Sequence, residues 1–163
     1  IDEIIDHYHQ KFPNLDKQPT TLLILLARTY NLTHEFLNKH AQKLGLSRAK
    51  FSILLILYRT PSGKLSMTDI SNQMHVTRTN ITKLVDGLEN DGFVERIPDP
   101  KDRRSSLVAL THKGQTFMNM HLDEYFYLSE WLMDGLSRQE KEMMESLLYK
   151  LIGSLMIKSK QFD

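Results

Sequence analysis

Cationic and hydrogen-bonding side chains are concentrated in one short segment, residues 78–83, of this 163-residue chain. Arginine and asparagine can each make two hydrogen bonds to a base edge, arginine to guanine and asparagine to adenine. A threonine methyl group can lie against the methyl group of thymine. Apolar residues at helical spacing predict a helix from Thr77 to about Asp91, whose first two turns would expose the polar residues. The exposed set is Arg78, Thr79, Asn80, Thr82 and Lys83.

Charge is unevenly distributed around this segment, although the whole chain carries a net charge of only +1. Residues 76–106 contain equal numbers of basic and acidic side chains. The acids Asp86, Glu89 and Asp91 lie towards the C-terminal end of the predicted helix, whereas its first two turns are basic and polar. A solvated polar face is the ordinary alternative for such a helix. The asymmetry favours a helix that enters the major groove of duplex DNA with its N-terminal end first.

A second basic segment follows the predicted helix, between two stretches rich in β-branched and apolar residues at 93–97 and 106–110. These stretches predict a hairpin whose tip is stiffened by Pro98 and Pro100. An arginine at such a tip can enter the minor groove, where narrow A·T-rich stretches concentrate negative potential. We expect Asp102 to orient a neighbouring arginine; an exposed charged turn is the alternative. The tip residues expected to contact DNA are Lys101, Asp102, Arg103 and Arg104.

A capping-box pattern at residues 66–69, Ser-Met-Thr-Asp, predicts a short helix that ends shortly before Thr77. Two short helices separated by a tight turn are a weak signal alone, because such pairs occur in many helical proteins. The hairpin directly after the second helix narrows the prediction to a winged helix–turn–helix. Ser66 and Thr68, at the start of the first helix, complete the residues that we expect to contact DNA.

Caps, glycines and prolines divide the rest of the chain into helices. Pro13 and Pro19 are expected to bracket a loop at residues 14–18, and Gly45 is expected to end the next helix. The chain is therefore predicted to be mainly α-helical with a small β-hairpin wing. The other predicted helices run over about 20–44, from Ser47 to before Pro61, from Thr111 to about 134, and from a Ser137 capping box to about Lys158.

Several short motifs follow one another between residues 80 and 114: Asn80-Ile81-Thr82-Lys83, Leu88-Glu89, Gly92-Phe93-Val94, Asp102-Arg103-Arg104, and Thr111 with Gly114. Together they resemble the signature of the MarR family of bacterial transcription regulators. The resemblance implies a homodimer that binds a pseudo-palindromic double-stranded DNA operator, usually to repress, and that a small phenolic or other lipophilic effector often releases. It also implies that Asp102 and Arg104 form a pair at the wing, with Arg104 in the minor groove.

Two long helices predicted after the hairpin carry wide apolar stripes, more than the winged helix alone needs. We expect this surface to be buried in a homodimer, together with the long helix from Thr20. A monomer with an extended helical core is the alternative. The predicted division is an N-terminal arm and dimerisation helix at 1–46, a winged helix–turn–helix at 47–110, and dimerisation helices at 111–163.

A small aromatic or lipophilic effector would fit in a crevice between the DNA-binding module and the dimerisation helices. Five residues are predicted to line it, although an ordinary core position is the alternative for each. They are Tyr30, His34, Phe51, Leu55 and Tyr58. Two other functions remain open: a regulator that senses a metal through His34 or His40 with His112, and a constitutive or architectural DNA-binding factor.

Composition argues against several other classes of function. The chain has no cysteine, which excludes disulfides and thiol-based sensing or catalysis. It has no nucleophile–base pattern, glycine-rich phosphate loop or paired-carboxylate motif, so we expect neither enzyme activity nor a cofactor. Arg28 interrupts the longest apolar run, residues 22–27, so no membrane span is expected and a cytoplasmic location is the default.

Overall fold

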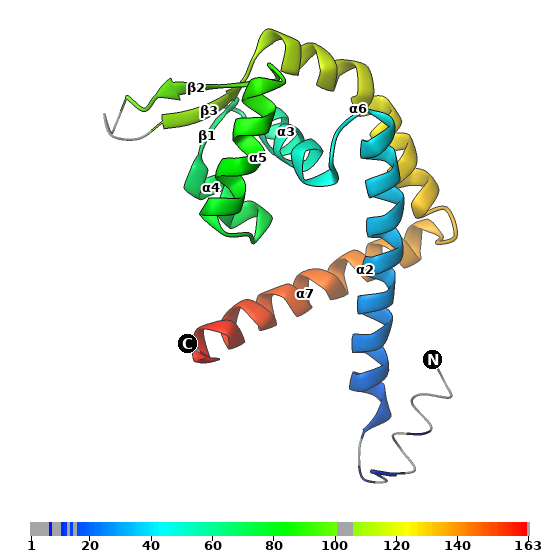
Figure 1. The fold of residues 1–163 in the computed structure, drawn as a ribbon. Coiled ribbons are helices and arrows are strands. Elements are labelled where there is room, and N and C mark those ends of the chain that lie inside the picture. The colour runs from blue at the N-terminus through cyan, green and yellow to red at the C-terminus, as the bar shows by residue number, and fades with distance from the viewer. Residues whose placement is uncertain (1–6, 8–10, 13, 15, 101–105, 163) are drawn as a thin grey trace. The chain divides into compact units, whose positions relative to one another are not determined.

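The computed structural model describes residues 7, 11, 12, 14, 16–100 and 106–162 of the chain (Figure 1). These residues are mainly α-helical with a small three-stranded antiparallel sheet, which confirms the predicted fold class. The chain divides into two compact units, Ile1–Met120 and His121–Asp163. The first unit holds all of the winged helix–turn–helix.

Helix α2 spans Lys17–Lys43 and begins earlier than the sequence predicted. The Asp16 side chain caps it by accepting a hydrogen bond from the backbone N–H of Gln18 at 3.0 Å. Pro19 therefore lies inside the first turn, where a proline is tolerated because its missing N–H would have no acceptor in the helix. The predicted loop at residues 14–18 is therefore wrong at Lys17 and Gln18, which belong to the helix. At the other end, Gly45 adopts a φ of 75° directly after the helix, as predicted.

The three helices of the winged helix–turn–helix are α3 (Arg48–Arg59), α4 (Met67–Met74) and α5 (Arg78–Asn90). Each begins at its predicted capping residue. The side-chain oxygens of Ser47, Ser66 and Thr77 accept hydrogen bonds from the backbone N–H three residues later, at 3.2, 3.1 and 3.4 Å. Each cap satisfies one N–H group that has no acceptor inside its helix.

The wing is an antiparallel hairpin of β2 (Val94–Pro98) and β3 (Ser106–Leu110), close to the predicted bounds. Its tip, residues 101–105, is outside the described residues. A further strand, β1 (Lys64–Ser66), pairs with the other edge of β3, and the sequence pattern did not predict it. A run of three residues is too short to show the alternation that identifies a strand. The sheet order β1-β3-β2 brings the beginning of α4 next to the wing (Figure 1).

One apolar core holds these elements together. It is formed by side chains from α3, α4, α5, the sheet and the first part of α6 (His112–Leu132). Helix α5 contributes one face of buried residues at helical spacing, which confirms the predicted orientation of its apolar face. The largest fully buried side chains are Ile53, Leu54, Leu57, Ile70, Ile81, Val85, Leu88, Val94, Val108 and Met118.

The C-terminal helices also begin at predicted caps. Thr111 caps α6 by accepting a hydrogen bond from a backbone N–H of the first turn at 3.0 Å. In the second unit, α7 spans Arg138–Phe162. Its capping box is reciprocal, because Glu140 N–H donates to Ser137 Oγ at 3.3 Å and Ser137 N–H donates to Glu140 Oε2 at 2.8 Å. Across the described residues, no helix has the length and apolar content needed to cross a membrane.

Candidate nucleic-acid interface

Helix α5 has one buried face and one exposed face. Ile81, Val85 and Leu88 on the buried face have no exposed surface. The polar residues predicted to meet base edges are all exposed: Arg78, Thr79, Asn80, Thr82 and Lys83. Because the helix begins at this end, backbone N–H groups that have no acceptor in the helix add partial positive charge there. The N-terminal half of α5 is therefore a cationic, hydrogen-bonding surface.

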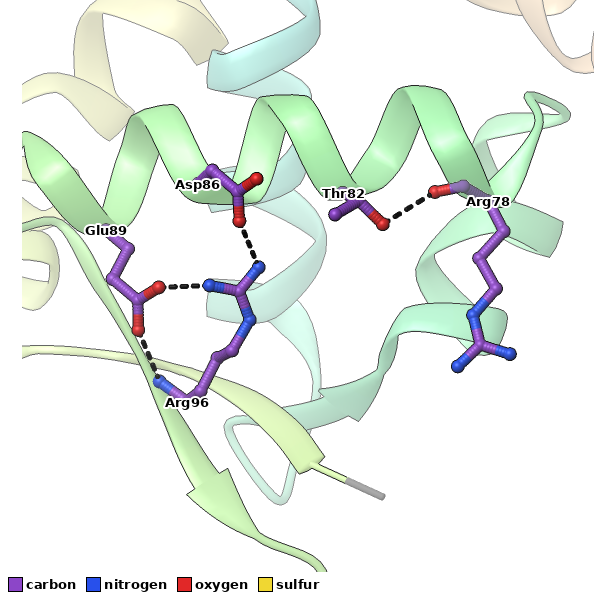
Figure 2. A network of polar contacts seen from close by, with 5 residues as sticks. All are labelled: Arg78, Thr82, Asp86, Glu89 and Arg96. Carbon is purple, nitrogen blue, oxygen red and sulfur yellow. Dashed lines mark hydrogen bonds and ion pairs between the residues drawn. The ribbon is translucent and has the colours of Figure 1, made fainter. Parts of the chain in front are cut away.

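One threonine on α5 uses its hydroxyl group within the helix. The Thr82 hydroxyl donates to the carbonyl oxygen of Arg78 at 3.0 Å (Figure 2). This bond holds the hydroxyl against the helix and leaves the Thr82 methyl group for contact with an apolar surface. The Arg78 side chain extends away from the other polar side chains in Figure 2, from the N-terminal end of α5.

Arg96 on β2 neutralises two of the acids on α5 (Figure 2). Its Nη2 lies 2.5 Å from Asp86 Oδ1, and its Nη1 contacts Glu89 Oε2. The backbone N–H of Arg96 also donates to Glu89 Oε1 at 3.2 Å. The pKa of the Arg96 guanidinium is raised above its ordinary value, chiefly by the hydrogen bond with Asp86. Arg96 thus joins the wing to α5. In the sequence it is simply one of the basic residues of the segment 76–106.

The third acid near the end of α5 is also paired. Lys50 of α3 has its Nζ 2.6 Å from Asp91 Oδ2. The lysine side chain passes over Gly87, where an added Cβ would lie 2.8 Å from Lys50 Cε. By contrast, Arg78 and Lys83 have no ion-pair partner in the described part of the chain. The three acids Asp86, Glu89 and Asp91 are therefore engaged in holding the fold together. Arg78 and Lys83, in the N-terminal half of α5, remain available to a polyanion.

The remaining predicted DNA contacts differ in their surroundings. Thr68 is exposed on the first turn of α4, whereas Ser66 is half-buried and caps that helix. The Ser66 hydroxyl also donates to Asp69 Oδ2 at 2.7 Å, so its hydrogen is used within the chain. The predicted wing-tip residues Lys101, Asp102, Arg103 and Arg104 are outside the described residues.

The turn between α4 and α5 has a feature that the sequence reasoning missed. His75 adopts a left-handed backbone, with φ 52° and ψ 42°, as no other non-glycine residue does in the described ranges. Ser71 closes the turn, because its hydroxyl donates to the carbonyl oxygen of Val76 at 2.5 Å. The left-handed region favours glycine, although histidine enters it more readily than most residues. The position of this histidine between two short helices was the available sequence signal.

A hollow of about 670 Å³ lies beside the helix–turn–helix within the first unit. Of the residues predicted to line an effector pocket, it brings together Tyr30, His34 and Leu55. Phe51 is instead buried in the core, where its ring packs edge-on against a histidine ring at 5.8 Å. Tyr58 is also elsewhere, and its hydroxyl donates to an asparagine side chain of α6 at 2.8 Å. Phe51 and Tyr58 lie further round α3 than Leu55, a distinction that apolar spacing alone does not make.

The lining of this hollow is more polar than the sequence suggested. Arg48, Arg59 and His75 all contribute to it. Arg59 Nη2 donates to Gln73 Oε1 at 3.0 Å, which ties α3 to the end of α4. His34 lies beside Tyr30, with ring centroids 5.6 Å apart. Over the described ranges, no cluster of three or more histidine, aspartate or glutamate side chains could hold a metal ion.

Known proteins are similar to this chain in sequence and in fold. Residues 46–106 match the family model described as the MarR family. The chain is 30% identical over 156 residues to the HTH-type transcriptional regulator PrsX of Escherichia coli, covering 95% of this chain and 93% of PrsX. It is 29% identical over 153 residues to the HTH-type transcriptional repressor YetL of Bacillus subtilis, covering 94% and 92% of the two chains. Its fold is similar to that of Sco3205, a MarR family regulator from Streptomyces coelicolor solved in complex with DNA, with a TM-score of 0.79, 20% identity, and coverage of 86% and 89%.

Proposed function

Because the chain belongs to the MarR family of transcriptional regulators, we propose that it represses transcription as a homodimer bound to a pseudo-palindromic DNA operator. It is a DNA-binding regulator and not an enzyme. The division of charge along α5 carries the proposal: its acids are paired with Arg96 and Lys50, while Arg78 and Lys83 are exposed without such partners in the described residues. Cations placed in this way can neutralise phosphates without bringing carboxylates near them. The name of YetL, a repressor, supports the proposed direction of regulation.

The exposed residues of α5 divide into base contacts and backbone contacts. Arg78 and Asn80 have the donors and acceptors to read guanine and adenine edges. Thr79 and Thr82 can contact thymine methyl groups, and Lys83 can neutralise a phosphate. Thr68 would contact the backbone beside α4. Beyond α5, the family resemblance pairs Asp102 with Arg104 at the wing and assigns the minor groove to Arg104. Lys101 and Arg103 are further proposed DNA contacts of the wing.

Operator binding by single variants tests the assignment. We expect Arg78→Ala to weaken binding by about 1–3 kcal/mol, the scale of one good base contact. Lys83→Ala should weaken binding about equally for all DNA sequences. It should also reduce the slope of log affinity against log salt concentration by about one. Arg138→Ala is the matched control, because that side chain is 92% exposed on α7 and pairs with a neighbouring glutamate. If Arg78→Ala and Lys83→Ala both bind the operator like the wild type, α5 is not the DNA-reading element.

We further propose that residues 47–110 bind DNA, while 1–46 and 111–163 form the dimer. The support is the amount of apolar surface outside the winged helix. Leu23 of α2 is 68% exposed, and Leu147 and Leu155 of α7 are 60% and 53% exposed. Exposed apolar helix faces of this kind mark interfaces between chains.

Sedimentation equilibrium tests the dimer. Leu147→Glu should give monomers at concentrations where the wild type is dimeric, because a carboxylate would be buried without a partner. Ser146→Glu is the control, since Ser146 precedes Leu147 on α7 and is outside its apolar stripe. A wild type that sediments as a monomer at high concentration would contradict the proposal.

The effector in this proposal binds the hollow lined by Tyr30, His34 and Leu55. An aromatic or lipophilic molecule with a hydrogen-bond acceptor suits a lining that combines apolar and cationic groups. Trp131, the only tryptophan of the chain, provides an emission signal for a panel of such molecules. Leu55→Phe should reduce the response by filling the hollow, whereas Tyr58→Phe should leave it unchanged. Operator binding that no panel molecule alters would favour a constitutive factor, and sensitivity to a chelator would favour a metal sensor.

A further inference from the structure

The C-terminal end of α5 is bonded directly to the beginning of α6. The Thr111 hydroxyl donates to the carbonyl oxygen of Gly92 at 2.7 Å, and the Thr111 N–H donates to that of Phe93 at 3.1 Å. The Lys113 ammonium donates to the carbonyl oxygen of Asp91 at 2.6 Å. The three residues that follow the last turn of α5 are thus each held by residues that begin α6. We call residues 91–93 and 111–114 the α5–α6 joint.

Packing in the joint leaves no room for the two helices to slide. An added Cβ on Gly114 would lie 2.1 Å from the carbonyl oxygen of Phe93. The Phe93 ring centroid lies 4.9 Å from that of Phe117 and 4.6 Å from Lys113 Nζ. A cation over an aromatic face is attracted by the negative charge of that face. The end of α5 therefore moves together with the first turn of α6.

Two lysines hold the same residue, Asp91, from two different helices. Lys50 of α3 is 2.6 Å from its carboxylate, and Lys113 of α6 is 2.6 Å from its carbonyl oxygen. Helix α3 belongs to the DNA-binding module itself. Helix α6 continues out of that module, into residues assigned above to the dimer. Lys113 therefore links α5 to the dimerising part of the chain, and Lys50 offers a matched control inside the module.

We infer that Lys113 is a positioning residue for DNA binding: it sets the direction of α5 relative to α6, and hence the separation of the two recognition helices in the dimer. The inference rests on the proposed homodimer. Helix α5 has 13 residues, and at about 1.5 Å per residue it is about 20 Å long. A tilt of about 10° at its C-terminal end would move its N-terminal end by about 3.4 Å, the rise of one base pair. A small change at the joint is thus enough to alter which half-site spacing fits.

The experiment compares duplexes whose half-site spacing differs by one base pair. The operator is first selected by the wild-type protein from a random pool, and three forms are made: the selected spacing, one base pair longer and one shorter. A duplex with a single half-site is the fourth probe. Full-length Lys113→Met, Lys113→Gln and Lys50→Met are compared with the wild type by fluorescence anisotropy at one salt concentration. Lys113→Arg keeps a cation and a donor in place and tests for rescue.

We expect Lys113→Met and Lys113→Gln to bind the single half-site like the wild type. Their preference for the selected spacing should fall by about threefold or more, the effect of one charge-assisted hydrogen bond. Lys113→Arg should restore the preference. Lys50→Met should weaken binding to all four duplexes by the same factor, because it loosens α5 inside the DNA-binding module. An unchanged spacing preference in both Lys113 variants, or equal losses for Lys113→Met and Lys50→Met, would overturn the inference. If the wild type binds the duplex with two half-sites no more tightly than the duplex with one, the proposed homodimer is contradicted instead.

Discussion

Arg96 on β2 has its Nη2 2.5 Å from Asp86 Oδ1 on α5, and the same guanidinium contacts Glu89 one turn further along (Figure 2). The pair crosses from the wing to the helix that carries the proposed base contacts. It holds two carboxylates against a cation, on the half of α5 away from Arg78. The wing and the helix are therefore coupled by charge as well as by the shared core.

Removing the guanidinium should expose this coupling. We expect Arg96→Met to lower the free energy of unfolding by about 1–2 kcal/mol, because the substitution leaves the two acids of this partly buried network without a cation. Operator affinity should also fall, since those acids would then add to the negative charge near DNA. Urea unfolding and operator titration measure the two effects. Adding Asp86→Asn and Glu89→Gln to Arg96→Met should recover most of the affinity; no recovery would show that the charge of the acids is not the cause.

The pKa of Arg96 predicts how this network responds to pH. Its pKa is raised in the folded chain, chiefly by the Asp86 hydrogen bond, so its stabilisation is complete below the ordinary arginine value and is lost only above the raised one. Between about pH 6 and pH 9 the difference in stability between wild type and Arg96→Met should therefore be constant. Urea unfolding at several pH values checks this. A difference that shrinks as the pH rises within this range would contradict the assignment.

Gly114 is the position where a side chain should do most damage. Its missing Cβ would lie 2.1 Å from the carbonyl oxygen of Phe93, a backbone atom that cannot move aside. We expect Gly114→Ala to cost about 3 kcal/mol or more in unfolding free energy. Gly135→Ala is the control, because nothing lies within 4 Å of the Cβ that it would add. Thermal unfolding of both variants makes the comparison, and similar melting temperatures would mean that the joint is looser than described.

The left-handed backbone of His75 predicts a stabilising substitution. At φ 52° glycine avoids the Cβ strain, so His75→Gly should raise the unfolding free energy by up to about 1 kcal/mol. Gly92 has φ 74°, so the opposite kind of change, Gly92→Ala, should lower the unfolding free energy by about 1–2 kcal/mol. Chemical denaturation measures both. A destabilised His75→Gly would indicate that the imidazole makes a contact worth more than the backbone strain.

The cap of α7 should weaken in acid. The pKa of Glu140 is lowered below its usual value near 4.5 by hydrogen bonds from Ser137. A lowered carboxyl pKa adds stability that is present above the usual value and is lost as the pH falls through the lowered one. Circular dichroism melts of wild type and Glu140→Gln should therefore differ at about pH 7 and converge as the pH falls through the lowered pKa of the carboxyl. A constant difference across this range would mean that the carboxylate charge is not what stabilises the helix start.

Helix starts were predictable because their cause is local. Ser47, Ser66, Thr77 and Ser137 each bond a backbone N–H three residues later, so a few neighbouring residues contain the whole signal. Strand β1 was not predictable for the opposite reason. It consists of three residues whose partners, Leu107 to Ala109, lie far along the chain. Only the folded sheet defines it.

The candidate site divides in the same way. The exposed polar face of α5 follows from the spacing of Ile81, Val85 and Leu88, because burying one side of a helix determines which side meets solvent. The roles of the other charges depended on long-range packing. In sequence, Arg96 and Lys50 look as available to DNA as Arg78 does, yet the fold commits them to Asp86, Glu89 and Asp91.

The sequence by itself thus determined the order of the elements apart from β1, the caps of α3 to α7, the family signature and the exposed polar half of α5, since each depends on neighbouring residues or helical periodicity. Tertiary structure alone decided which charges are used within the fold, which of the five pocket candidates share a hollow, and how α5 is held to α6. These depend on contacts between residues distant in sequence, such as Lys113 with Asp91. Such contacts form only once the apolar core has brought the elements together.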